Sequence, residues 1–150
     1  MEFELTPIEK INDNFYVKRD DLFIPYSDLP INGGKVRQCI LLIENNLNYI
    51  KNECNNWVYT SGGILSPQSV ILARVCKEYG INFKFFRGCT STPKSNNLLD
   101  ICEHLGGVID STTKQGFENI LNHTIEQHKL NGEKFFHVNL ELMLKQIENQ

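Results

Sequence analysis

The sequence predicts an α/β fold of three layers, in which a mostly parallel sheet lies between helices on both faces. Short apolar stretches alternate along the chain with helical patterns of 12 residues or more, which is the order of βαβ units. The chain has 150 residues, of which 41% are hydrophobic and 22% charged, and this suits one globular domain with a sizeable core. The predicted strands are residues 15–18, 56–61, 81–88, 108–111 and 134–138.

The helices are predicted from apolar residues spaced three and four apart between these strands. Glycine and proline mark their ends, because proline suits a first helical turn and glycine suits the position after the last one. The expected helices are a segment from about Lys35 to Glu53, a segment through residues 70–76 that Gly80 closes, a segment from Pro93 to Gly106, a segment within residues 113–132, and a last one in residues 140–150.

The same pattern divides the chain into three stretches. Residues 1–34 form a leading segment with one strand and a loop rich in proline. Residues 35–138 carry the alternating strands and helices of a Rossmann-like domain, and residues 139–150 form a helical tail.

Composition and charge exclude several classes of function. The net charge is −3 and the basic residues are scattered, which does not fit a nucleic-acid-binding protein. The N-terminus lacks the apolar core of a signal peptide, and no apolar run approaches the ~20 residues of a membrane span. The five cysteines form no C-x-x-C pair, so we expect a reducing, cytoplasmic setting without disulfides or a zinc site. The four histidines show no metal-ligand spacing.

The stretch "TSGGILS" is the first candidate site. Ser61, Gly62 and Gly63 follow a predicted strand and precede a helix, at the sheet edge where ligands bind in open α/β folds. Paired glycines let backbone amides approach a carboxylate or phosphate closely. The alternative is a plain strand-to-helix turn, with Ser66 as the N-cap and Pro67 at the first helical position.

Lys35 is the second candidate, because it opens a helix directly after two glycines. Cations are better placed at helix C-termini, so the helix dipole favours the neutral amine here. A neutral amine is the nucleophile that condenses with the aldehyde of pyridoxal phosphate. The alternative is a solvated lysine in the first turn of a surface helix.

Two neighbouring features are expected to be structural. The run "KRDD", residues 18–21, is predicted to form local ion pairs rather than an acid–base site. Arg37 is predicted to lie on the face of the helix, although it could assist in binding an anion.

Taken together, these motifs resemble a known series in a known order. "TPIEKI", "FYVKRDDL", "GGKVRQ", "VYTSGGILSPQSVILARVCKEYG" and "FKFFRG" are similar to the first half of fold-type II pyridoxal-phosphate enzymes. The family is that of 1-aminocyclopropane-1-carboxylate deaminase and D-cysteine desulfhydrase, and the resemblance spans roughly residues 5–138. It implies the fold of the small domain of such enzymes, like that of the tryptophan synthase β subunit.

The resemblance also implies roles for individual residues. Lys35 matches the lysine that forms an imine with the cofactor and later moves protons at the substrate. Ser66 matches a serine that lies over the substrate, and the amides of Gly62 and Gly63 would hold the substrate carboxylate together with Ser61. The implied cofactor-binding residues are Lys35, Gly34 and Gln68.

Three departures limit this transfer. Gly34 replaces the asparagine that usually precedes the lysine, and Pro67 replaces an asparagine that bonds the cofactor ring in relatives. Proline has no side-chain amide and no backbone donor. Family members are over twice this length, and their second half supplies the phosphate loop and the partner of the pyridine nitrogen.

Two functions therefore stay open. The first is a truncated or split lyase or deaminase (a hydrolase in the case of the deaminase), which acts on a small amino acid with pyridoxal 5'-phosphate. It would be inactive as an isolated chain and would need a second polypeptide. The second is a non-catalytic binding or interaction module derived from such an enzyme, which would form homo-oligomers through the surface that the other domain covers. Neither uses nucleic acid, a membrane or a metal.

Overall fold

The computed structural model describes residues 4–88, 97–113 and 118–139. The chain divides into two compact units, Met1–Leu41 and Leu42–Gln150, and each is described by itself. The division between the two units falls inside the first helix, and the domain boundaries predicted after residues 34 and 138 stay predictions. The predicted helix in residues 140–150, and Pro93 with its neighbours, lie outside the described residues.

The first unit begins with a hairpin of two antiparallel strands, β1 (Ile8–Asn12) and β2 (Phe15–Lys18). Strand β2 confirms the prediction for residues 15–18, but β1 was not predicted. Its two isoleucines are three residues apart, a spacing that does not alternate as a strand should. The register shifts between Lys10 and Asn12, and this irregularity explains the missing alternation.

Between the hairpin and the first α-helix lies a short 3-10 helix, η1 (Asp20–Leu22). The helix predicted over residues 35–53 is in fact two helices, α1 (Gly34–Asn45) and α2 (Leu47–Glu53), so that prediction was wrong in one respect. The break is at Asn46, whose Nδ2 donates a hydrogen bond to the carbonyl oxygen of Leu42 at 2.8 Å. Asparagine side chains compete with the backbone for such bonds, while the apolar spacing continues across the break.

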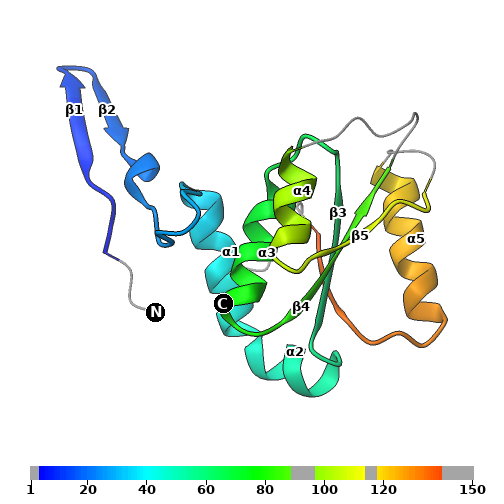
Figure 1. The fold of residues 1–150 in the computed structure, drawn as a ribbon. Coiled ribbons are helices and arrows are strands. Elements are labelled where there is room, and N and C mark those ends of the chain that lie inside the picture. Colours follow the sequence, from blue (N-terminus) through cyan, green and yellow to red (C-terminus); the bar gives the residue numbers. More distant parts are fainter. Residues whose placement is uncertain (1–3, 89–96, 114–117, 140–150) are drawn as a thin grey trace. The chain divides into compact units, whose positions relative to one another are not determined.

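The second unit is built on a four-stranded, wholly parallel sheet with the order β5-β4-β3-β6. Helices α3 and α4 cover one face and α5 covers the other, which confirms the three-layer α/β prediction (Figure 1). The four strands predicted from residue 56 onward are all present; the first is shifted by one residue and the other three are shorter by one or two residues. The elements are β3 (Trp57–Gly62), α3 (Gln68–Glu78), β4 (Asn82–Arg87), α4 (Asn97–His104), β5 (Val108–Asp110), α5 (Glu118–Leu130) and β6 (Phe136–Val138).

The core of the second unit lies on both faces of strands β3 and β4. In the paired strands Thr60 is level with Phe85, and both are fully buried. On the α5 face, Tyr59 and Phe86 form a cluster with Leu121 and Ile125 of that helix. These alternating positions explain why β3 and β4 are almost continuously apolar in the sequence, as strands covered on both faces are.

Glycine ends helix α4 as predicted. Gly106 has a φ of +93°, and its amide donates to the carbonyl oxygen of Glu103 at 2.9 Å. Within the described ranges, none of the helices combines the length and apolar character needed to cross a bilayer. The four cysteines that the structure describes are buried thiols, and burial raises the pKa of Cys39 and Cys102 to about 12.

Candidate functional site

The lysine turn belongs to the first unit. Lys35 is the second residue of α1 and is exposed. Gly33, which precedes the helix, has a φ of +94° in the left-handed region that only glycine adopts readily. Its amide donates to the carbonyl oxygen of Phe23 at 3.1 Å, and its own carbonyl accepts from Val36 at 3.1 Å. The backbone conformation at position 33 therefore requires a glycine. The two hydrogen bonds of Gly33 hold the start of α1, and with it Lys35, in place.

The second glycine of the pair is explained by Asp20. A Cβ atom on Gly34 would lie 3.2 Å from Oδ2 of Asp20, which is tight. The other oxygen, Oδ1, accepts from Thr6 Oγ1 at 2.8 Å and lies 3.0 Å from Lys18 Nζ. These hydrogen bonds, first that of Thr6, hold the pKa of Asp20 below its usual value. A larger residue at position 34 would therefore require a shift of a few tenths of an ångström at this carboxylate, which lies against the turn.

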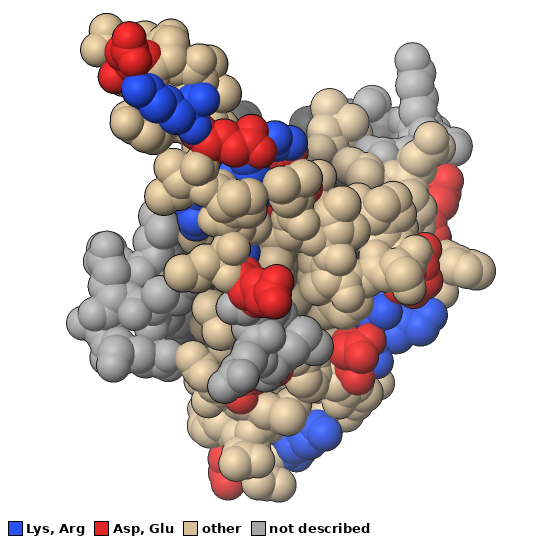
Figure 2. All heavy atoms as spheres, turned by 90° about the vertical axis from the view of Figure 1, so that its left-hand side faces the viewer, with Lys and Arg blue, Asp and Glu red and all other residues tan. Residues whose placement is uncertain are grey.

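The run "KRDD" makes local ion pairs, as predicted. Besides the pair of Lys18 with Asp20, Arg19 bonds both Glu9 and Asp21 at 2.8 Å. Hydrogen bonds with Asp21 and Glu9 raise the pKa of Arg19 above its usual value. Acidic and basic side chains alternate over the hairpin and its base in Figure 2. This cluster joins the hairpin to the segment before the lysine turn.

Arg37 lies one turn into α1 and contacts an aromatic ring. Its Cζ is 4.4 Å from the centroid of the Phe23 ring, in a cation–π contact. Its Nε and Nη2 atoms are buried and have no hydrogen-bond partner among the described residues. Arg37 thus packs on the helix face as predicted, and a role in binding an anion stays a prediction.

The glycine turn belongs to the second unit and lies at the carboxyl end of β3. The strand order places β3 next to β6, so this end is the point where successive connections diverge to opposite sides of the sheet. Ligands of open α/β sheets bind at such a point. Ser61 and Gly62 end the strand, and the amide of Ser66 donates to the carbonyl oxygen of Gly63 at 2.9 Å, which closes a tight turn. The structure thus brings the four predicted carboxylate-binding residues together.

Backbone conformation does not explain these two glycines. Neither Gly62 nor Gly63 has a φ in the left-handed region. A Cβ atom on Gly62 would make ordinary contact with the Phe85 ring at 3.4 Å, and one on Gly63 would meet no atom within 4 Å. Among the described residues, the backbone of Gly63 therefore has room beside it for a closely approaching anion.

Ser66 is half-buried and makes a weak cap. Its Oγ accepts from the amide of Gln68 at 3.4 Å, and its carbonyl accepts from Ser69 Oγ at 3.3 Å. The helix begins at Gln68 with Pro67 as its N-cap residue, one position later than the plain-turn alternative expected. A hydrogen bond of 3.4 Å is long, so the capping role holds this hydroxyl only loosely.

Gln68 lies beneath the turn. Its side chain is fully buried, and Nε2 donates to Thr60 Oγ1 at 3.1 Å. The Thr60 hydroxyl in turn donates to the carbonyl oxygen of Val138 at 2.6 Å. This chain of bonds joins the start of α3, the end of β3 and the end of β6, directly below the glycine turn. A contact of Gln68 with a cofactor stays a prediction.

Thr60 was not identified from the sequence, although a hydroxyl within an otherwise apolar strand indicates a buried hydrogen bond. We expect Thr60→Val, which has the same shape, to lower the free energy of unfolding by about 1–3 kcal/mol, because two buried partners lose their hydrogen bond. Thr112→Val is the control, since that hydroxyl is exposed and bonds Asp110 only two residues away. Urea unfolding of both variants measures the difference, and equal effects would contradict the role of Thr60.

No family model matches the chain. A Thermotoga maritima protein named "Putative 1-aminocyclopropane-1-carboxylate deaminase" is 32% identical over 127 residues, which are 84% of this chain and 37% of that protein. The chain therefore spans little more than a third of the length of this relative.

Two solved structures are similar in fold, each with 14% sequence identity. Cysteine synthase from Entamoeba histolytica matches with a TM-score of 0.53 over 69% of this chain and 29% of that one. Diaminopropionate ammonia lyase from Escherichia coli, in its apo form, gives a TM-score of 0.44 over 67% of this chain and 28% of that one. Cysteine synthase has the fold that the sequence motifs predicted for this chain.

Proposed function

Because the chain is related to fold-type II pyridoxal-phosphate enzymes of the 1-aminocyclopropane-1-carboxylate deaminase type, we propose that it is the lysine-bearing part of such an enzyme. The reaction would be a lyase or deaminase reaction on a small amino acid, of the kind of 1-aminocyclopropane-1-carboxylate or D-cysteine. The sequence likeness to the Thermotoga maritima protein carries the proposal, since it includes 84% of this chain.

The residues of the two turns fit parts of the cofactor and substrate. Pyridoxal phosphate, when bound, supplies an aldehyde for an amine and a ring that withdraws electrons from the substrate. Lys35 would hold the cofactor through its amine and move a proton at the substrate carbon. The amides at Gly62 and Gly63, with Ser61 and Ser66, would bind and orient the substrate carboxylate. The open space at Gly63 supports this assignment.

A further region would be needed to complete the site, and the proposal places it on a second polypeptide. It would supply a glycine-rich loop for the cofactor phosphate and a partner for the pyridine nitrogen. Without a phosphate site, the amine of Lys35 would hold the cofactor weakly and in no fixed orientation. The proposal therefore expects no turnover by these 150 residues alone. The buried free thiols support a reducing, cytoplasmic setting.

The experiment mixes the chain with pyridoxal phosphate and with candidate polypeptides that carry a glycine-rich phosphate loop. The expected result is the visible absorbance band of a lysine-bound cofactor, together with ammonia or sulfide release from a small amino acid. No such band in any mixture would contradict the proposal.

A non-catalytic interaction module is the second candidate, and the hairpin favours it. Isolated two-stranded hairpins are marginally stable in water, and this one is exposed on both faces. Large apolar side chains gather there with 43% to 84% of their surface exposed; they are Leu5, Ile8, Ile11, Phe15, Tyr16, Val17, Leu22 and Ile24. Such a surface is typical of a site for another protein or another copy of the chain.

The two candidate functions predict different effects of Lys35→Ala and different oligomeric states of the chain. The module would keep its biological activity in Lys35→Ala and would form homo-oligomers that dissociate when Phe15 and Val17 are replaced by serine. Sedimentation of the wild-type chain and of this double variant measures the second point. A monomeric wild-type chain, or activity lost with Lys35→Ala, would contradict the module.

A further inference from the structure

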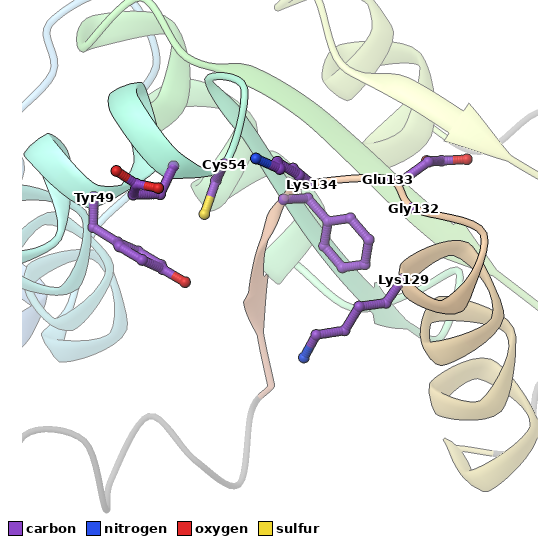
Figure 3. A pocket seen from close by; sticks show the side chains of 8 residues that line it. Tyr49, Cys54, Lys129, Gly132, Glu133 and Lys134 are labelled. Carbon is purple, nitrogen blue, oxygen red and sulfur yellow. The ribbon is translucent and has the colours of Figure 1, made fainter.

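A pocket lies in the second unit, away from the glycine turn. Its cavity volume is about 400 Å³, which is within the range of small-molecule sites. The end of α2 forms one wall, and the end of α5 with the connection to β6 forms the other (Figure 3). Its lining residues are Tyr49, Glu53, Cys54, Lys129, Gly132, Glu133, Lys134 and Phe135.

The pocket is at the opposite edge of the sheet from the glycine turn. Cys54 precedes β3, and Phe135 precedes β6, so the pocket adjoins the amino ends of these two strands. The glycine turn follows the carboxyl end of β3. Six residues of strand separate the two edges by roughly 17 Å, at about 3.3 Å per residue. The pocket is therefore distinct from the proposed substrate site.

The pocket lining carries two lysines and two glutamates, and one of the glutamates, Glu133, is engaged by side chains outside the lining. Lys129 and Lys134 make no ion pair with any carboxylate that the structure describes, and Figure 3 shows Lys129 reaching into the same space as Tyr49 from the other wall. Glu133 points away from that space. Its Oε2 accepts from the Tyr59 hydroxyl at 2.7 Å, and its Oε1 lies 2.7 Å from Nδ1 of His128.

The pocket lining has two further ionisable groups, the Cys54 thiol and the Glu53 carboxylate. Burial raises the pKa of the Cys54 thiol, which therefore stays neutral at pH 7. Glu53 is the remaining carboxylate of the lining, and it opposes two lysines. The two lysines thus attract an anionic group of a ligand to the pocket. A positively charged group on the same ligand would be tolerated beside the Glu53 carboxylate.

Aromatic rings supply the rest of the wall. Tyr49 is 55% exposed and is steadied by an edge contact with Phe136, with 6.4 Å between ring centroids. Phe135 is stacked on Tyr59, with 4.0 Å between centroids and 12° between planes. Both rings are therefore held in place while part of their surface stays accessible to a planar ligand.

We propose that this pocket binds a small aromatic carboxylate. The carboxylate is held by Lys129 and Lys134, and the ring packs against Tyr49 and Phe135. The geometry of one unit carries this inference, so it is independent of the proposed function of Lys35.

Trp57 provides the measurement. It is the one tryptophan in the sequence, and its amide donates to the carbonyl oxygen of Cys54 at 2.9 Å, beside the pocket. Benzoate is the probe, with inorganic phosphate and benzyl alcohol as probes of the anion alone and of the ring alone. We expect a saturable change in tryptophan fluorescence with benzoate in the millimolar range or below, and at least tenfold weaker responses with the other two.

Two pairs of lysine substitutions make the test specific. The double variant Lys129→Ala/Lys134→Ala should bind benzoate at least tenfold more weakly. The double variant Lys51→Ala/Lys77→Ala, which removes the same charge from exposed lysines outside the lining, should bind as the wild type does. Lys35→Ala should also bind benzoate normally, which separates this site from the lysine turn.

Three results would overturn the proposal. They are the absence of a saturable signal, equal affinity in the two double variants, and a response to inorganic phosphate as strong as that to benzoate. All four lysines are exposed, so these variants are expected to fold, and circular dichroism checks that they do.

Discussion

Replacing Lys35 with alanine is expected to abolish turnover by the completed enzyme, with a loss of about a thousandfold or more. No other group can take the place of an amine that both holds the cofactor and moves the proton. Lys35 is exposed in the first turn of α1, and alanine favours a helix, so the free energy of unfolding should change by less than about 0.5 kcal/mol. A loss of function without a loss of stability is therefore the signature of this residue.

The measurement is reduction of the mixture of protein, completing polypeptide and pyridoxal phosphate with borohydride, followed by peptide mass analysis. In the wild type the cofactor should be found on Lys35 in preference to other lysines. Lys77→Ala, at an exposed position in the last turn of α3, is the control and should leave both labelling and turnover unchanged. Labelling spread evenly over the exposed lysines, or turnover retained in Lys35→Ala, would contradict the proposed enzymatic function.

Phe85→Ala is expected to have the largest effect on stability, a loss of about 3–5 kcal/mol in the free energy of unfolding. Phe85 is fully buried in β4, and its ring lies where a Cβ on Gly62 would touch it. The substitution removes a large core side chain and also the support beneath the glycine turn. Since domains of this size are stable by only about 5–15 kcal/mol, the loss is a large part of the total.

Urea unfolding, followed by the fluorescence of Trp57, measures this loss. Leu130→Ala is the control, because that side chain is 76% exposed and should cost less than about 0.5 kcal/mol. A cost for Phe85→Ala below about 1 kcal/mol would mean that the sheet does not form the core described above.

Local patterns were sufficient for most of the fold. The parallel strands of the second unit were predicted because they are short apolar runs bounded by polar turns, and the caps at Gly80 and Gly106 because glycine tolerates a positive φ. The two errors have a local cause as well. A register shift in β1 hid its alternation, and the apolar spacing continued across Asn46 although its side chain ends helix α1.

The candidate site divides in the same way. The sequence by itself determined the residue types and their order, namely a lysine after paired glycines and a glycine turn after an apolar strand, because these depend on neighbours along the chain. Only the tertiary structure decided that the Asp20 carboxylate lies against Gly34, that Thr60 joins Gln68 to Val138, and that Lys129 faces a pocket with Tyr49. Apart from the bond between Thr60 and Gln68, which are 8 positions apart, each of these joins residues 14 to 80 positions apart. The packing that brings such distant residues together is set by the whole fold, so no local pattern could have predicted it.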